Sequence, residues 1–292
     1  MIRIVTPVKT DLPERRLGFG DVIVGVGSCF SQYLMEHLAQ RGFAAAWNPG
    51  GIVYNAISIE DSISRVVDER LFTENDFFKT GDLWRNWELH GSLSSPDLGE
   101  ALTRANDLLR QFREKLLVAK LFVLTPSSSV VYRLRSDGRV VANCHKMPSH
   151  TFERGVLSPE RNRGALGSVI EAVRKINPDC MIVISLSPVR HYPGDLVLNT
   201  LSKANLLSAI HDCIDCRRGV YYFPAYEILL DELRDYRFYN DDLLHPSELA
   251  RRIILERFLE AYCDDDARRR IDEAEAALKA KGHRPLHETR NE

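Results

Sequence analysis

The chain has 292 residues, of which 44% are hydrophobic and 27% are charged, and its formal net charge is −2. This composition supports a large buried core, which excludes disordered, collagen-like and coiled-coil classes for most of the chain. The nearly balanced charge gives no sign of a nucleic-acid partner. We expect neither an export signal nor a membrane span, because residues 1–16 include no continuous apolar stretch and no later stretch reaches membrane-spanning length. We therefore expect a cytoplasmic protein whose six cysteines are reduced thiols.

Short β-branched runs alternate with amphipathic segments along the chain, and this alternation predicts parallel strands joined by helices. The predicted strands are 21–26, 120–125, 180–187 and 220–223. The predicted helices are 30–38, 98–116, 159–177, 202–213, 225–234 and one that begins at Ser247 and buries Leu249, Ile253, Ile254, Phe258 and Ala261. We expect a three-layer α/β/α sandwich with a parallel sheet of about five strands, of the flavodoxin-like type.

Two segments interrupt the alternation. An aromatic, irregular stretch covers 72–95, and a β-hairpin pattern covers 129–142 around Ser136-Asp137-Gly138. We expect one catalytic domain over 1–262, with excursions at 66–97 and 126–157. More than half of residues 264–292 are charged, which predicts a charged C-terminal helix and tail over 263–292. That helix is a candidate surface for homo-oligomer formation.

The turn after the first strand, Gly25-Val-Gly-Ser28-Cys-Phe30, places a serine at the carboxyl end of the strand. Phe30 stands where a dinucleotide fingerprint and a GxSxG elbow both need glycine, and no P-loop lysine follows. Ser28 is therefore a candidate nucleophile, or simply the residue that caps its own helix. Cys29 is a rival nucleophile in the same turn.

The second candidate group lies far downstream, in the loop that precedes the last predicted helix of the domain. Asp242 stands three residues before His245, a spacing that lets the carboxylate orient the imidazole and stabilise its cation. Asp241 is a rival partner, at a spacing of four. The alternative is that Asp242 sets the entry to the helix and that His245 only packs.

Six motifs, taken together and in order, resemble the GSCFA-domain family, a branch of the SGNH/GDSL hydrolases. They are GSCF at 27–30, NPGGIVYN at 48–55, the Trp84 to His90 stretch, NCHK at 143–146, Ser187-Pro-Val189 and Asp242-Leu-Leu-His-Pro246. The resemblance extends over about residues 1–262. This chain has Ser31 where the family's name motif ends in alanine, a position that begins the helix rather than the reactive turn.

The resemblance implies a role for each matching residue. Ser28 would be the nucleophile, His245 the general base and acid, and Asp242 the carboxylate that orients it. The oxyanion hole would consist of the Ser28 and Gly51 N–H groups and the Asn143 amide. His90 and His145 are candidates for substrate contact or for hydrogen-bonded structural residues.

The leading expectation is a serine esterase that acts on an O-acyl ester, such as an acylated carbohydrate, through an acyl-enzyme. An O-acyltransferase would use the same triad, and a non-catalytic binding or scaffold protein could share the fold. We expect no metal site, because the single Cys213-x-x-Cys216 pair has no second pair at zinc spacing. The proposed acyl-enzyme chemistry implies no organic cofactor. Trp84 and Trp87 are candidates to line a substrate pocket or to form a small core.

Overall fold

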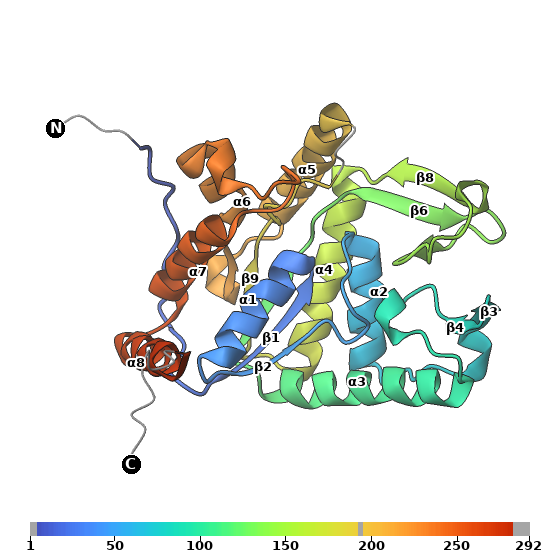
Figure 1. The fold of residues 1–292 in the computed structure, drawn as a ribbon, viewed down its shortest axis with the longest axis horizontal. Coiled ribbons are helices and arrows are strands. Elements are labelled where there is room, and N and C mark those ends of the chain that lie inside the picture. Colours follow the sequence, from blue (N-terminus) through green and yellow to red (C-terminus); the bar gives the residue numbers. More distant parts are fainter. Residues whose placement is uncertain (1–4, 192–194, 283–292) are drawn as a thin grey trace, which may run out of the picture.

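The computed structural model describes residues 5–191 and 195–282, with side chains up to residue 276. A five-stranded parallel sheet in the order β10-β9-β5-β1-β2 forms its centre (Figure 1). The strands are β1 (Val22–Gly27), β2 (Ala44–Trp47), β5 (Leu121–Thr125), β9 (Met181–Ile184) and β10 (Val220–Tyr222). The flavodoxin-like α/β prediction is confirmed, since the order reverses between β1 and β5.

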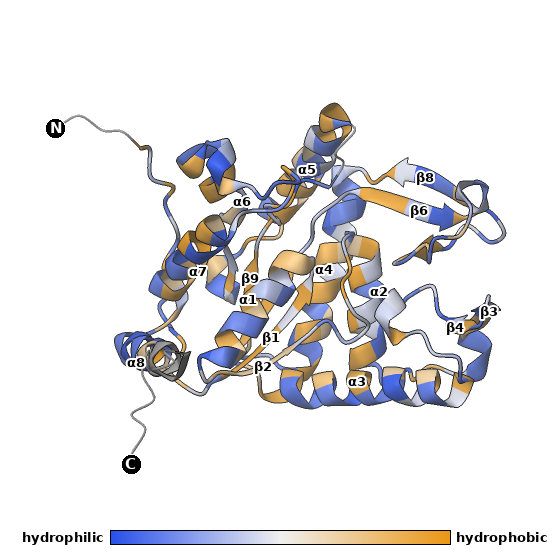
Figure 2. Ribbon diagram, in the orientation of Figure 1, coloured by the Kyte–Doolittle hydropathy of each residue, from blue (hydrophilic) through white to orange (hydrophobic). Residues whose placement is uncertain are grey.

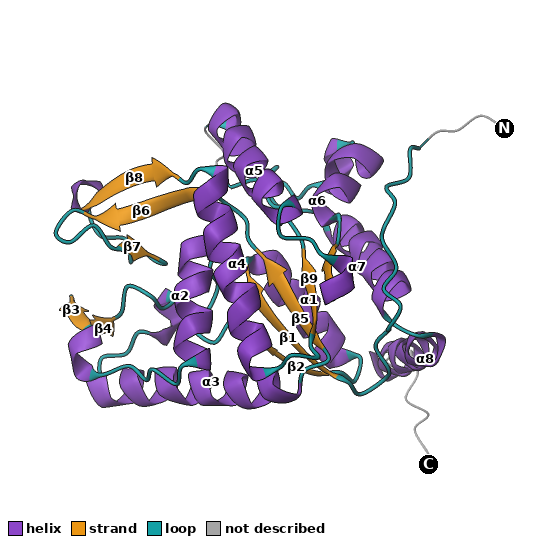
Figure 3. Cartoon of the chain, turned by 180° about the vertical axis from the view of Figure 1, so that it is seen from behind, coloured by secondary structure: helices purple, strands orange, loops and turns teal. Residues whose placement is uncertain are grey.

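Helices cover both faces of the sheet, as buried strands on either side require. The helices α1 (Cys29–Gln40) and α7 (Glu248–Tyr262) pack with Ile23, Val123 and Val183 on one face. The opposite face buries Val24, Phe122 and Ile182, and Figure 3 shows it in front. Its helices are α2 (Ala56–Val67), α3 (Leu98–Val118), α4 (Pro159–Ile176) and α5 (Leu196–His211). Alternate residues of each strand thus enter different cores.

Both predicted excursions contain antiparallel strands and project from the same end of the molecule (Figure 1). The first contains the hairpin β3 (Phe78–Thr80) and β4 (Leu83–Arg85), and the second is a three-stranded sheet of β6 (Val130–Leu134), β7 (Val140–Val141) and β8 (Phe152–Val156). Short helical segments lie at Glu74–Asp76, Gly91–Leu93, Ser149–Thr151, Cys216–Arg218 and Tyr236–Phe238. The predicted 225–234 helix consists of α6 (Ala225–Glu227) and a π-helical turn, Ile228–Leu233.

The structure differs from the sequence-based expectation at several elements. The strand β2 and the helix α2 were not expected, because the Ala44-Ala-Ala run lacks the β-branched residues typical of strands. The helix α5 begins six residues earlier than predicted, at Leu196. Leu249 was expected in the core but is 53% exposed, because it faces away from the buried side of α7.

The C-terminal helix α8 (Asp265–Gly282) packs against the domain rather than standing apart. Ala267 and Ile271 are buried in the same core as α1 and α7, and Arg41 forms an ion pair with Glu275. The other described residues of α8 are mostly hydrophilic (Figure 2). The predicted tail after Gly282 lies outside the described residues. None of the described helices is long and apolar enough to cross a membrane.

Candidate active site

Ser28 occupies the sharp turn between β1 and α1, as predicted. It is the N-cap of α1, its side chain is fully buried, and its Oγ accepts a hydrogen bond from the Phe30 N–H at 3.3 Å. The preceding Gly27 has φ +139°, and a Cβ there would lie 2.3 Å from the carbonyl oxygen of Thr125. Only glycine fits this turn, which fixes the serine at the carboxyl edge of the sheet.

The loop after β2 holds this turn from the side. The Asn48 Oδ1 accepts a hydrogen bond from the Gly27 N–H at 2.8 Å, and the Val53 N–H donates to the Gly27 carbonyl at 3.0 Å. The Asn48 side chain is 6% exposed, and its Nδ2 has no partner among the described residues. Sequence reasoning found the motif that begins at Asn48 but not this contact, because hydrogen bonding between strand ends is not visible in local spacing.

The Asp242–His245 pair is formed within one short loop. The His245 Nδ1 and the Asp242 Oδ2 are 2.7 Å apart, while the Asp242 Oδ1 accepts the backbone N–H groups of Leu244 and His245 at 2.9 and 3.0 Å. These two backbone hydrogen bonds and the contact with the ring lower the pKa of Asp242 to about 2. The carboxylate is therefore ionised at neutral pH and is the natural acceptor for an Nδ1 proton.

Asp241, the rival partner, has an exposed side chain that makes none of the hydrogen bonds described for this loop. Two backbone hydrogen bonds hold the loop that contains Asp242 and His245. The Asn240 N–H donates to the His245 carbonyl at 2.8 Å, and the Arg190 N–H donates to the Leu244 carbonyl at 3.1 Å. The geometry therefore favours Asp242 over Asp241 as the partner of His245.

Two contacts, the Arg190–Leu244 hydrogen bond and a ring contact, connect this loop to the serine turn. The rings of Tyr54 and His191 are 4.6 Å apart, which joins the loop beside Gly27 to the segment that holds Leu244. Burial, together with the charges of Lys203 and His245, lowers the pKa of His191 to about 4, so its ring is neutral. No hydrogen bond between Ser28 and His245 is present among the described residues, and the serine hydroxyl is instead turned toward Phe30.

The two expected backbone donors of the oxyanion hole are engaged within the protein. The Ser28 N–H donates to the Thr125 carbonyl at 3.1 Å, and the Gly51 N–H donates to the Asn48 carbonyl at 2.8 Å. Asn143 follows β7, where its Oδ1 accepts the His145 N–H at 2.8 Å. Its amide Nδ2 donates to no residue in the described part of the chain.

The two additional histidines have clear packing partners. The His145 Nε2 donates to the Asn86 carbonyl at 2.7 Å, and the ring packs with Phe78 and Trp87. Burial lowers the pKa of His145. His90 caps a short helical turn and packs against Gly51, where an added Cβ would lie 2.2 Å from the His90 Cβ.

The described geometry does not favour Cys29 as a nucleophile, because burial raises the pKa of its thiol. The Trp87 ring stacks on Phe78, with 4.0 Å between centroids, and it packs against a small core of Leu134, Val141 and Phe152 in the second excursion. The described residues contain no cluster of metal-ligating side chains.

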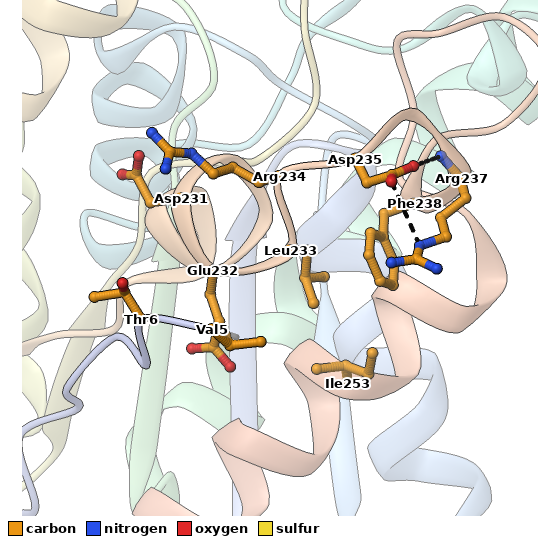
Figure 4. A pocket seen from close by; sticks show the side chains of 10 residues that line it. All are labelled: Val5, Thr6, Asp231, Glu232, Leu233, Arg234, Asp235, Arg237, Phe238 and Ile253. Atoms are coloured by element: carbon orange, nitrogen blue, oxygen red, sulfur yellow. Dashed lines mark hydrogen bonds and ion pairs between the residues drawn. The ribbon is translucent and has the colours of Figure 1, made fainter. Parts of the chain in front are cut away.

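Two cavities differ in their relation to the serine turn. One of about 550 Å³ is lined by charged side chains of the 231–237 segment, including Glu232 and Arg234 (Figure 4), and neither Ser28 nor His245 lines it. Another, of about 390 Å³, lies beside β2 and is lined by Gln32, Trp47, Asn48, Gly51, Ser92 and Gln111, among others. Only the second includes residues that bind the serine turn, since the Gln32 N–H donates to the Ser28 carbonyl.

Three solved structures show a distant likeness to this chain. A carbohydrate esterase family 3 protein from Talaromyces cellulolyticus has a TM-score of 0.38 and 8% identity, covering 87% of this chain and 99% of its own. A family two carbohydrate esterase from Clostridium thermocellum, in complex with cellohexaose, has a TM-score of 0.37 and 12% identity, covering 94% and 67%. An acetyl xylan esterase from the rumen bacterium Butyrivibrio proteoclasticus has a TM-score of 0.36 and 10% identity, covering 93% and 66%.

No curated protein is similar enough in sequence to be matched. The sequence model of the GSCFA family matches residues 22–258, which include β1, the serine turn, all five strands of the parallel sheet and the Asp242–His245 loop. This range is far more than half of the chain. The family resemblance predicted from the six motifs is confirmed, and the chain belongs to the GSCFA family.

Proposed function

We propose that this protein is a serine esterase in which Ser28, His245 and Asp242 act together on an O-acyl ester. The observation that carries the proposal is the 2.7 Å contact between the His245 Nδ1 and the Asp242 Oδ2. An ionised carboxylate in this position holds the Nδ1 proton and leaves the Nε2 lone pair free to act as a base. Family membership and the serine at the N-terminus of α1 support the same assignment.

In this mechanism, the Ser28 hydroxyl turns from Phe30 toward the imidazole. The His245 Nε2 takes the hydroxyl proton while Oγ forms a bond to the ester carbonyl carbon. The imidazolium then returns the proton to the alcohol oxygen as the carbon–oxygen ester bond breaks. Water, activated by the same nitrogen, attacks the acyl-enzyme and releases the acid and the free serine.

The negative charge that develops on the carbonyl oxygen needs donors near the N-terminus of α1. The α1 dipole favours an anion there. We assign the Ser28 and Gly51 N–H groups and the Asn143 amide to this role. The two backbone donors would have to exchange their present carbonyl acceptors for the oxyanion.

The cavity beside β2 supports an ester with an uncharged, hydroxyl-bearing alcohol. The side chains that line it are neutral, and they combine the Trp47 ring with the amides of Gln32 and Gln111 and the hydroxyl of Ser92. Amide and hydroxyl groups exchange hydrogen bonds with alcohols without a charge penalty, and an aromatic ring offers an apolar face. An acylated carbohydrate has this chemistry.

The test is covalent labelling with a fluorophosphonate, together with hydrolysis of p-nitrophenyl acetate. We expect the wild-type protein to be labelled at Ser28 and to turn over the ester. The Ser28→Ala variant should lose labelling and at least about 10³-fold in turnover. Equal labelling of both proteins would exclude Ser28 as the nucleophile, and no labelling of either would favour a non-catalytic scaffold.

The full burial of Ser28 favours one second candidate, an O-acyltransferase, because a serine closed off from solvent protects its acyl-enzyme from water. A transferase would release the alcohol in a burst without releasing free acid. Turnover would then resume when a sugar or another hydroxyl acceptor is added. Steady release of acid without an acceptor would identify a hydrolase.

A further inference from the structure

Lys203, in α5, is a buried cation that none of the sequence motifs includes. Its side chain is 2% exposed, and its Nζ donates to the Ser187 carbonyl at 2.6 Å and to the Ser127 Oγ at 3.4 Å. Ser187 follows β9 and Ser127 follows β5, so the ammonium lies between the ends of two adjacent strands. The ion pairs of the described residues give Lys203 no carboxylate partner.

The segment 187–191 connects Lys203 to the loop that contains His245. Lys203 holds the Ser187 carbonyl, and Asn199, one turn earlier in α5, accepts the His191 N–H at 3.0 Å. Between these two anchors, the Arg190 N–H donates to the Leu244 carbonyl. Leu244 directly precedes His245, so α5 is linked to the base through this segment.

The second contact of Lys203 leads to the nucleophile. The Ser127 N–H donates to the Tyr54 carbonyl at 2.8 Å, and the neighbouring Val53 N–H donates to the carbonyl of Gly27 at 3.0 Å. Gly27 directly precedes Ser28. One ammonium group thus binds both the loop network that carries the serine and the segment that carries the histidine.

Burying this charge costs stability. Burial lowers the pKa of Lys203 to about 7, as expected for an ammonium removed from water without a counter-ion. A methionine would fill the same space without this cost. If position 203 had only a packing role, an apolar side chain there would give a more stable protein.

We propose that Lys203 is a positioning residue that holds Ser28 and His245 in register by hydrogen bonding to the ends of β5 and β9. The proposal rests on the esterase function proposed above. Lys203 touches neither the ester nor the reacting atoms in this scheme. Its effect is exerted through Ser187, Arg190 and Leu244 on one side and through Ser127 and Tyr54 on the other.

The first test compares the fluorophosphonate labelling rate at Ser28 in the wild type, in Lys203→Met and in a matched control, Lys175→Met. Lys175 forms an exposed ion pair with Asp68 and has no contact with this network. We expect labelling to slow about 10²-fold in Lys203→Met, because a misplacement of about 1 Å between reacting groups has an effect of this size. The control should label at the wild-type rate. Equal rates in Lys203→Met and the wild type would overturn the proposal.

The second test uses chemical rescue and does not depend on the stability of one variant. Lys203→Ala should label slowly, and n-propylammonium, which matches the missing atoms, should restore the rate. The compound 1-fluoropropane fills similar space but has no hydrogen-bond donor, and it should not restore the rate. Rescue by both compounds to the same extent would show that Lys203 only fills space.

A third readout is independent of catalysis. The amide hydrogens of Arg190 and His191 should exchange faster with solvent in Lys203→Met, because both amides lie in the segment that Lys203 holds at Ser187. Unchanged protection would contradict the positioning role, even if the wild type shows no labelling. If the wild type is not labelled but exchange is faster in Lys203→Met, the esterase function is contradicted and the positioning role of Lys203 is not.

Discussion

The hydroxyl of Tyr33 donates a hydrogen bond to the carboxylate of Glu248 at 3.3 Å, across 215 positions of the chain. Tyr33 lies in the second turn of α1, and Glu248 is the first residue of α7. The Arg251 guanidinium lies 4.7 Å from the centre of the same ring. The N-terminal ends of these two helices are therefore adjacent. Ser28 caps one of them, and His245 stands three residues before the other.

The carboxylate of Asp242 is expected to control the tautomer of His245. In Asp242→Asn, the amide can donate to Nδ1, which would force the proton to Nε2 and remove the base. We expect kcat to fall roughly 10³-fold, with little change in melting temperature. Ester hydrolysis and thermal unfolding check this on one preparation.

Asp241→Asn is the matched control, since it removes a neighbouring exposed charge and leaves the Asp242 contacts in place. Its kcat should stay within about twofold of the wild type. A large loss in Asp241→Asn together with normal activity in Asp242→Asn would reverse the assignment.

Much of the sheet could be predicted because parallel strands buried on both faces are continuous apolar runs. The segments at β1, β5, β9 and β10 have this pattern. The edge strand β2 was not predicted, because its three alanines lack the β-branched side chains typical of strands. The start of α5 was missed for a related reason: its buried face carries Asn199, Ser202 and Lys203, which a periodicity argument assigns to solvent.

The Asp242–His245 contact could be predicted because both residues lie in one turn, where spacing constrains geometry. The contacts that join this turn to Ser28 could not. They pass through backbone atoms of Arg190 and Leu244 and through the ring contact of Tyr54 and His191. Such contacts depend on how strand ends meet, and neither residue type nor spacing records them.

Gly51 is expected to tolerate no side chain. It has φ +87°, and an added Cβ would lie 2.2 Å from the His90 Cβ. Gly51→Ala should lower stability by about 2 kcal/mol or more, through backbone strain and overpacking. It should also lower activity, because the loop that binds Gly27 would shift.

The adjacent glycine provides the control for this loop. A Cβ on Gly50 would lie 3.2 Å from the Leu89 Cδ2, the end of a flexible side chain. Gly50→Ala should therefore reduce the unfolding free energy less than Gly51→Ala, as measured by urea denaturation. Equal losses would show that the close contact with His90 does not determine the choice of glycine.

Asn143 is the proposed oxyanion donor with no direct hydrogen bond, among the described residues, to the serine turn or to Asn48. Asn143→Ala removes its amide and also the acceptor of the His145 N–H. If Asn143 acts on the oxyanion, kcat should fall about 10²-fold while KM stays nearly constant. Asn143→Asp keeps the acceptor for His145 and should lose as much activity. Normal activity in both variants would remove Asn143 from the oxyanion hole.

Lys203 also predicts how stability depends on pH. Its pKa in the folded protein is about 7, compared with 10.5 for an exposed lysine. Below pH 7 both states carry the proton, so this residue adds no pH dependence. Between pH 7 and 10.5 the unfolded state binds the proton and the folded state does not, so stability rises with pH.

The difference in unfolding free energy between the wild type and Lys203→Met isolates this effect, because all other groups are common to both proteins. The methionine variant should be the more stable at pH 6, and its advantage should shrink as pH rises toward 10. The lowering of the Lys203 pKa from 10.5 to about 7 corresponds to a change of about 5 kcal/mol in unfolding free energy between these two pH values, at 1.36 kcal/mol for each pH unit. Urea denaturation at pH 6, 8 and 10 measures the difference. A difference that stays constant with pH would show that Lys203 is not the desolvated cation described here.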